Sequence, residues 1–93
     1  MMKVKWLHNG WVEYQQLAKT DKRQTCKINS LIEDIQLNGA EKGIGKPEAL
    51  KGELSGYYSR RIDKKNRLIY YVYNDGEDKV LVISSCIGHY DDK

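Results

Sequence analysis

Glycine and proline interrupt the chain repeatedly between Asn38 and Gly56, and this segment separates two stretches of different periodicity. The interruptions are Gly39, Gly43, Gly45, Pro47, Gly52 and Gly56. Both residue types break long helices and strands, so the sequence predicts a loop here with one turn at Pro47–Leu50. Loops of this length in compact domains are commonly functional or disordered. The segment before this loop and the segment after it should therefore form different secondary structures, which the loop connects.

Before the loop, apolar residues recur at the spacings of three and four that are typical of amphipathic helices. The two stripes are Trp11, Tyr14, Leu17 and Ala18, and then Ile28, Leu31, Ile32 and Ile35. We expect the first helix to begin at Asn9 or Gly10. Thr20 is the expected N-cap of the second helix, with Asp21 in its first turn, and Asn38–Gly39 closes that helix. The short joint predicts an αα-hairpin.

The sequence predicts four strands, and the first of them alternates polar and apolar residues. These are Lys3–Leu7, Tyr57–Ile62, Arg67–Tyr73 and Lys79–Ile87. The last three form an antiparallel meander, because the links between them, Asp63–Asn66 and Asn74–Asp78, are short and polar. The predicted fold class is α+β: an N-terminal αα-hairpin packed on one face of a mostly antiparallel sheet of four to five strands. We expect residues 1–93 to form a single domain.

Positive charge is concentrated in the middle of the chain. The cations there are Lys42, Lys46, Lys51, Arg60, Arg61, Lys64, Lys65 and Arg67, and the acids among them are Glu48, Glu53 and Asp63. The whole chain carries a net charge of only +3. A basic middle of this kind indicates a polyanionic partner, most simply nucleic acid, and the alternative is a solvated charged face.

Composition and length exclude several classes of protein. Cys26 and Cys86 make neither a disulfide framework nor a C-x-x-C metal knuckle. The start, MMKVKWLHNG, lacks the apolar region of a signal peptide, and no window approaches the about 18 apolar residues of a membrane span. So short a chain has too thin an interior for a large cofactor. We therefore expect a cytoplasmic protein with no membrane contact, no metal and no cofactor.

One candidate of each type needed for metal-independent RNA cleavage is present. RNA supplies its own nucleophile, the 2′-hydroxyl, so an enzyme needs a base, cations for the phosphoryl oxygens and an acid for the leaving 5′-oxygen. Glu48 in the loop is the candidate base. His89, which follows the last strand and precedes Tyr90, is the candidate acid. Alternatively, Glu48 is only a first-turn acid, and the terminal His-Tyr pair is only a frayed end.

Four stretches carry a resemblance to a known family. They are TDKRQTCKINSLIEDI from Thr20, GIGKPEALKGELSGYYSRRID from Gly43, NRLIYYVY from Asn66 and SSCIGHY from Ser84. Together they resemble the YoeB toxins of bacterial toxin–antitoxin pairs, within the RelE/ParE superfamily, in register from about Val4 to Tyr90. The resemblance implies a ribosome-dependent mRNA interferase. Such a toxin cleaves mRNA in the A site of the 70S ribosome and is inhibited by a cognate antitoxin of the YefM/Phd type.

The resemblance also implies roles for the residues that match. Glu48 falls on the general base, Arg67 on the phosphate-stabilising arginine and His89 on the general acid. The RNA-binding or site-shaping positions are Lys51, Tyr58, Arg60, Arg61 and Tyr90. Trp11 matches an aromatic residue at the family's dimer contact, which implies a homodimer. The tail Asp91-Asp92-Lys93 departs from the family pattern, and its two acids would favour protonated His89 or repel RNA.

Two functions from other classes remain as alternatives. A ParE-like toxin that inhibits gyrase would share the fold but would not need Glu48, Arg67 and His89 together. A passive RNA-binding module would explain the basic loop but would have no use for a histidine opposite a carboxylate. The sequence therefore favours the endoribonuclease.

Overall fold

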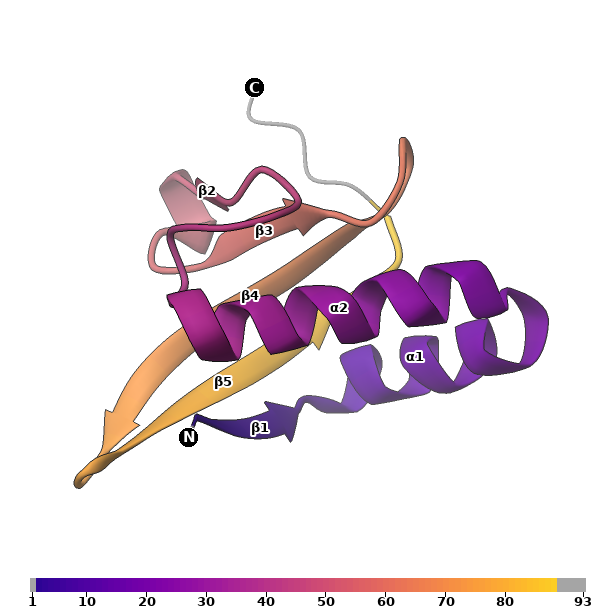
Figure 1. Ribbon diagram of the computed structural model, residues 1–93. Coiled ribbons are helices and arrows are strands. Elements are labelled where there is room, and N and C mark those ends of the chain that lie inside the picture. Colours follow the sequence, from indigo (N-terminus) through magenta and orange to yellow (C-terminus); the bar gives the residue numbers. More distant parts are fainter. Residues whose placement is uncertain (1, 89–93) are drawn as a thin grey trace.

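The computed structural model describes residues 2–88, and Figure 1 shows the arrangement of their helices and strands. In chain order the elements are β1 (Lys3–Trp6), α1 (His8–Thr20), α2 (Lys22–Asn38), β2 (Glu48–Ala49), the 3-10 turn η1 (Gly52–Leu54), β3 (Tyr58–Arg61), β4 (Arg67–Asp75) and β5 (Asp78–Ser85). The strands form one sheet in the order β1-β5-β4-β3-β2. Only the β1–β5 pair among these strands is parallel. The predicted α+β class is confirmed.

The helix starts differ from the expectation. α1 begins at His8, slightly earlier than expected. The N-cap of α2 is Asp21 rather than Thr20, because Asp21 Oδ1 accepts a hydrogen bond from the backbone N–H of Gln24 at 3.2 Å. The Thr20 hydroxyl instead donates to the carbonyl of Gln16 at 2.9 Å, within α1. Thr20 is thus the last residue of α1, and the carboxylate beside it caps α2.

The expected turn at Pro47–Leu50 is wrong. β2 occupies Glu48–Ala49 and pairs antiparallel with β3, while the turn falls at η1. The backbone N–H of Leu50 donates to the carbonyl of Tyr57 at 2.9 Å, and the Leu50 side chain is buried. A strand of two residues has no readable alternation, so only its pairing across the sheet reveals it.

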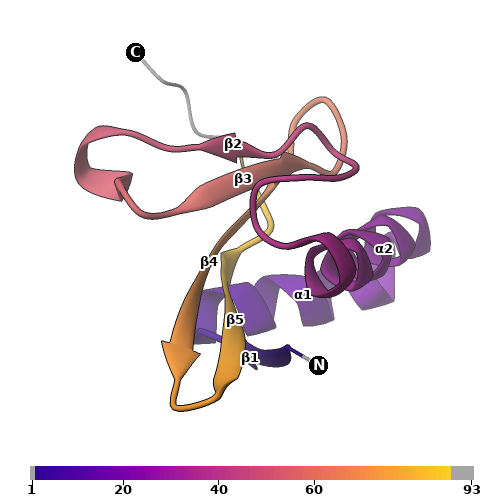
Figure 2. The same ribbon diagram turned by 60° about the vertical axis from the view of Figure 1, so that its left-hand side comes forward.

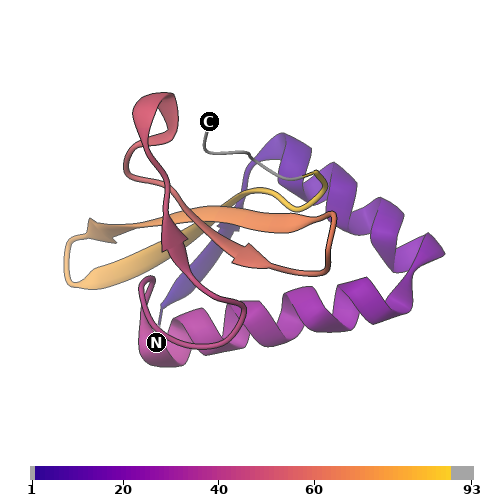
Figure 3. The same cartoon turned by 90° about the horizontal axis from the view of Figure 1, so that it is seen from above.

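Both helices pack against one face of the sheet, as expected, and α2 contributes most of the packing. The buried residues that meet there are Leu17 of α1, Ile28, Leu31 and Ile35 of α2, and Leu68, Tyr70, Leu81 and Ile83 of the strands. Trp11 and Ala18 of the expected α1 stripe stay exposed. Figure 3 shows α2 running alongside the sheet, and Figure 2 shows that the sheet twists strongly, with β2 and β3 turned away from the β4–β5 hairpin.

Arg60 is buried in this core, so the expectation that it faces RNA is wrong, and a role in shaping the site stays a prediction. Its side chain is fully buried, and all five of its N–H groups donate hydrogen bonds. Nε donates to the hydroxyl of Tyr70 at 2.9 Å, and Nη1 donates to Asp34 Oδ2 of α2 at 2.5 Å. The other acceptors are the carbonyls of Ile44, Gly39 and Lys42. One side chain thus joins the sheet, α2 and the glycine-rich loop.

The loop passes too close to α2 for larger residues at two of its glycines. Gly43 has φ +125°, and a Cβ there would lie 1.7 Å from Asp34 Oδ2. Gly45 has φ +82°, and a Cβ there would lie 2.7 Å from Leu31 Cδ2. Both the backbone conformation and the close approach require glycine. These contacts position the chain just before β2.

Folding stability in acid is expected to depend on the Arg60–Asp34 pair. The hydrogen bond from Arg60 holds the pKa of Asp34 below its ordinary value of 3.8, although partial burial acts in the opposite direction. A carboxyl group with a lowered folded-state pKa adds stability above its unfolded pKa, and this contribution is lost as pH falls through the folded pKa. In urea unfolding, the free-energy difference between wild type and Asp34→Asn should be largest near about pH 6 and shrink below about pH 4. A difference that stays constant down to about pH 2 would contradict this linkage.

Candidate functional site: a basic pocket beside Glu48

The register of the sheet places three of the expected site residues on one face. Glu48 pairs with Ser59, and Arg61 pairs with Arg67. Paired residues of neighbouring strands point to the same side, and so do residues two apart along a strand. Glu48, Arg61 and Arg67 therefore share the sheet face that lies opposite the core. Arg60 points the other way because it is the neighbour of Arg61 on β3.

A basic pocket of about 550 Å³ lies where β3 ends and β4 begins. Its lining residues are Lys27, Gly45, Lys46, Arg61, Ile62, Asp63, Lys64 and Arg67. Five of these side chains are cationic and one is acidic, so the pocket is strongly electropositive and suits phosphate groups. Lys27 of α2 was not among the expected site residues. No local motif marks it, because only the packing of α2 beside the β3–β4 turn brings it here.

Arg67 is held in place at the rim of this pocket. Its Nη1 donates to the carbonyls of Asp63 at 2.8 Å and Asn66 at 3.2 Å. Nε and Nη2 make no hydrogen bond to residues 2–88 and can therefore serve a ligand. The backbone N–H of Arg67 donates to the carbonyl of Gly88 at 2.8 Å, and the Gly88 N–H donates to Asn66 Oδ1 at 2.8 Å. The chain just before His89 is thus fixed beside Arg67.

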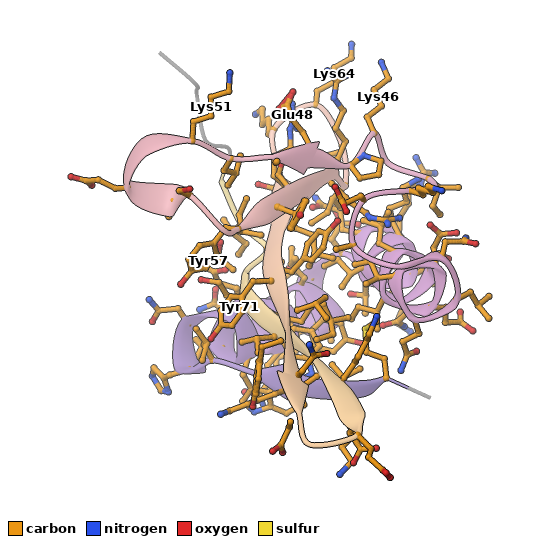
Figure 4. All side chains as sticks on the ribbon, turned by 90° about the vertical axis from the view of Figure 1, so that its left-hand side faces the viewer. Lys46, Glu48, Lys51, Tyr57, Lys64 and Tyr71 are labelled. Carbon is orange, nitrogen blue, oxygen red and sulfur yellow. The ribbon has the colours of Figure 1, made fainter. Side chains whose placement is uncertain are left out.

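Glu48 lies next to the pocket but does not line it. Its side chain is exposed, and in the described part of the chain it has neither a hydrogen-bond nor an ion-pair partner. Figure 4 shows Glu48 at the same end of the molecule as Lys46, Lys64 and Lys51. Lys51, which is also exposed, stands outside the pocket as well. The structure therefore brings a free carboxylate to a cationic surface.

The other expected site residues have different surroundings. Tyr58 is half-buried on the face opposite Glu48, where its ring stacks on that of Tyr70 with centroids 5.8 Å apart. A contact between Tyr58 and RNA stays a prediction. Trp11 is 44% exposed and packs against Trp6 at 5.6 Å, far along the sheet order from β2. His89, Tyr90 and the tail Asp91-Asp92-Lys93 lie outside the described residues.

Residues 2–88 lack two features that metal binding and membrane crossing require. They contain no group of three or more histidine, cysteine or acidic side chains that could hold a metal ion. They also contain no helix of the length and apolar character that a membrane crossing requires. The expected absence of a metal ion and of a cofactor stays a prediction for the whole chain.

Comparison with known proteins identifies the family. The family described as the YoeB-like toxin of the bacterial type II toxin–antitoxin system matches residues 6–90. Toxin YoeB of Escherichia coli strain K12 is 45% identical over 89 residues, which are 96% of this chain and 100% of that protein. The chain belongs to the YoeB family of type II toxins. The resemblance inferred from the sequence is confirmed.

Solved structures of YoeB toxins have the same fold. In a heterotetrameric YoeB–YefM toxin–antitoxin complex from Staphylococcus aureus, the similar chain has a TM-score of 0.86 and 40% identity, over 97% of this chain and 99% of that one. A YoeB dimer from the same organism has a TM-score of 0.84 and 39% identity, over 96% and 98% of the two chains. In this chain, the basic pocket and Glu48 described above are therefore built on a fold that is shared with solved YoeB toxins.

Proposed function

We propose that the chain is a ribosome-dependent endoribonuclease that cleaves mRNA without a metal ion and so inhibits translation. The observation that carries the proposal is the placement of Glu48, Arg61 and Arg67 on one sheet face beside a basic pocket. Cleavage by the 2′-hydroxyl of RNA needs a base, for which a carboxylate is suited, and cations close to the same phosphate. Membership of the YoeB toxin family supports the same activity.

In this mechanism Glu48 is the general base. Its exposed carboxylate takes the proton of the 2′-hydroxyl as the 2′-oxygen attacks the adjacent phosphorus. Arg67, with Nε and Nη2 available, stabilises the negative charge that builds on the phosphoryl oxygens, and Arg61 assists it. Lys46, together with the other lysines of the pocket, binds flanking phosphates. Lys51 stands on the far side of Glu48 and adds to the positive field.

The leaving group receives its proton from His89. A single peptide bond joins His89 to Gly88, whose carbonyl accepts from the N–H of Arg67. As the bond from phosphorus to the 5′-oxygen breaks, the imidazolium protonates that oxygen. Tyr90 is the aromatic residue that the family pattern assigns to shaping the site. The products are a 2′,3′-cyclic phosphate and a 5′-hydroxyl. No water or metal ion enters this first step.

The proposed partners follow from charge and from family. A YefM-type antitoxin inhibits the toxin by covering the basic pocket with acidic residues, as oppositely charged surfaces favour. YefM is the partner in the complex with the Staphylococcus aureus relative. The exposed Trp11 with Trp6 and Tyr14 offers an apolar contact for a homodimer. The place of action is the ribosome in the cytoplasm.

The exposed carboxylate distinguishes this function from its alternatives. In a passive RNA-binding module, Glu48 would repel the phosphates that the neighbouring cations attract. A ParE-like gyrase inhibitor acts by binding protein and needs no unpaired carboxylate at a cationic pocket. A catalyst, in contrast, requires a base there.

The chemistry of the RNA ends tests the proposal. Cleavage of ribosome-bound mRNA should survive EDTA when the ribosomes are kept intact by crosslinking, because the 2′-hydroxyl is the nucleophile. The upstream fragments should end in a 2′,3′-cyclic or 3′-phosphate, and end-labelling of purified fragments measures this. The same mRNA without ribosomes is the control for ribosome dependence. Fragments with 3′-hydroxyl ends would point to a metal-activated water and contradict the mechanism.

A further inference from the structure

The sheet face that carries Arg67 continues into a row of tyrosines. Side chains alternate along β4, so Arg67, Tyr71 and Tyr73 lie on the same face. The register shift between β4 and β5 does not interrupt this alternation, because the extra residue, Ser84, belongs to β5. Ile69 lies between Arg67 and Tyr71 on this face and is buried, so the aromatic rings follow the basic pocket after one covered position.

Three tyrosines stand together on this face. The ring centroids of Tyr57 and Tyr71 are 5.0 Å apart, and those of Tyr71 and Tyr73 are 6.3 Å apart. Tyr73 is 39% exposed, and the other two are half-buried. Their hydroxyls make no hydrogen bond within residues 2–88. Figure 4 shows Tyr57 and Tyr71 side by side on the side of the sheet away from α2.

Two buried valines lie behind the tyrosines, and an exposed lysine stands beside them. Tyr71 pairs with Val82, which pairs in turn with Lys5 of β1, and Tyr73 pairs with Val80. Both valines are buried, yet neither they nor the three tyrosines belong to the core beneath the helices. Lys5 is exposed and has no ion-pair partner in the described part of the chain. The result is a firm aromatic surface with a cation at its rim.

We propose that Tyr57, Tyr71 and Tyr73, with Lys5, form a stacking platform for the bases of single-stranded RNA next to the cleavage site. Aromatic side chains on an open sheet stack on bases of any sequence, while nearby cations attract the phosphates. The inference rests on the proposed function, because the RNA reaches the platform from the basic pocket.

Continuity with the basic pocket favours RNA over a protein partner on this surface. β4 links the platform to the pocket on one face, so one strand of RNA can contact both. At the far end, the β4–β5 hairpin carries Asp75, Glu77 and Asp78, and Asp78 already pairs with Lys3 at 3.2 Å. These acids repel phosphate, so we expect the bound RNA strand to extend no further along β4 than Tyr73. An acidic antitoxin segment would meet the same repulsion.

Binding of an RNA that cannot be cut tests the platform. The probe is a fluorescent single-stranded RNA of about 12 nucleotides with every 2′-hydroxyl methylated, and its affinity is measured by fluorescence anisotropy. Tyr73→Ala should bind it about 5- to 150-fold more weakly, the usual effect of losing one base–aromatic stack. Tyr73→Phe keeps the ring and should bind like wild type. Because Tyr73 is exposed, both variants should fold, and thermal unfolding is the measurement that checks this.

The controls separate this proposal from the proposed function. Glu48→Gln should lose cleavage yet bind the probe at least as tightly as wild type. If the proposed cleavage chemistry is wrong but Tyr73→Ala still weakens probe binding, the surface binds RNA independently of that chemistry. Equal affinity of wild type, Tyr73→Ala and Tyr73→Phe would overturn it. If Tyr73→Ala binds the antitoxin more weakly but binds the RNA probe like wild type, the surface belongs to a protein partner. That result would also overturn the proposed RNA platform.

Discussion

Replacing Glu48 with glutamine is expected to lower the rate of mRNA cleavage by about 10²–10⁴-fold, the usual contribution of one general acid or base. Glutamine has nearly the same shape but cannot accept the proton of the 2′-hydroxyl. The fold should be unchanged, because Glu48 is exposed and makes no hydrogen bond or ion pair within residues 2–88. The measurement is single-turnover cleavage on ribosomes that hold a defined mRNA codon in the A site.

The chain offers a matched control for this experiment. Glu53 is an exposed glutamate in η1, five positions further along the chain. Glu53→Gln changes the net charge by the same amount, so it measures any general effect of charge on RNA binding. Its cleavage rate should stay close to that of wild type. Equal rates for Glu48→Gln and wild type would remove Glu48 from the chemistry and leave the proposed mechanism without a base.

Arg60→Met is expected to destabilise the fold by about 3–5 kcal/mol, the typical cost of removing one partner of a buried ion pair. Methionine can fill much of the space but donates no hydrogen bond. The loss leaves Asp34, the Tyr70 hydroxyl and three loop carbonyls without the donor that they share. Small domains have only about 5–15 kcal/mol of total stability, so a large part of it should disappear.

The neighbouring arginine provides the control for Arg60. Arg61→Met removes the same charge from the next residue of β3, where the side chain is exposed, and should change the stability by less than about 0.5 kcal/mol. Arg60→Lys keeps the charge but cannot supply five donors in a fixed plane. The stability of Arg60→Lys should therefore lie between those of Arg60→Met and Arg61→Met. Urea unfolding followed by circular dichroism measures all three. A similar stability for Arg60→Met and Arg61→Met would show that the buried network adds little.

Local periodicity is sufficient to predict most of the secondary structure. The spacing of Ile28, Leu31 and Ile35 predicted α2 and its buried face, and the glycine after Asn38 predicted its end. Boundaries were less certain, since both Thr20 and Asp21 are good N-caps and only their hydrogen bonds choose between them. The two-residue β2 could not be predicted, because two residues show no alternation and only their pairing with β3 defines the strand.

For the candidate site, the sequence predicted the residue types, and the structure decided which of them lie together. Glu48, Arg61 and Arg67 share a face because β2 and β4 pair with β3 in one particular register. The same register turns Arg60 into the core, although its sequence environment is nearly that of Arg61. Side-chain direction in a sheet alternates with every residue, so a shift of one position would exchange the two arginines.

The sequence by itself thus determined the helices, most of the strands, the basic character of the middle segment and the family. Those properties depend on neighbours within a few positions or on the order of residues along the chain. The tertiary structure alone decided that Lys27 of α2 joins the basic pocket and that Tyr71 and Tyr73 continue the face of Arg67. These placements depend on contacts between segments that are distant in the chain, and such contacts form only when the apolar faces pack together.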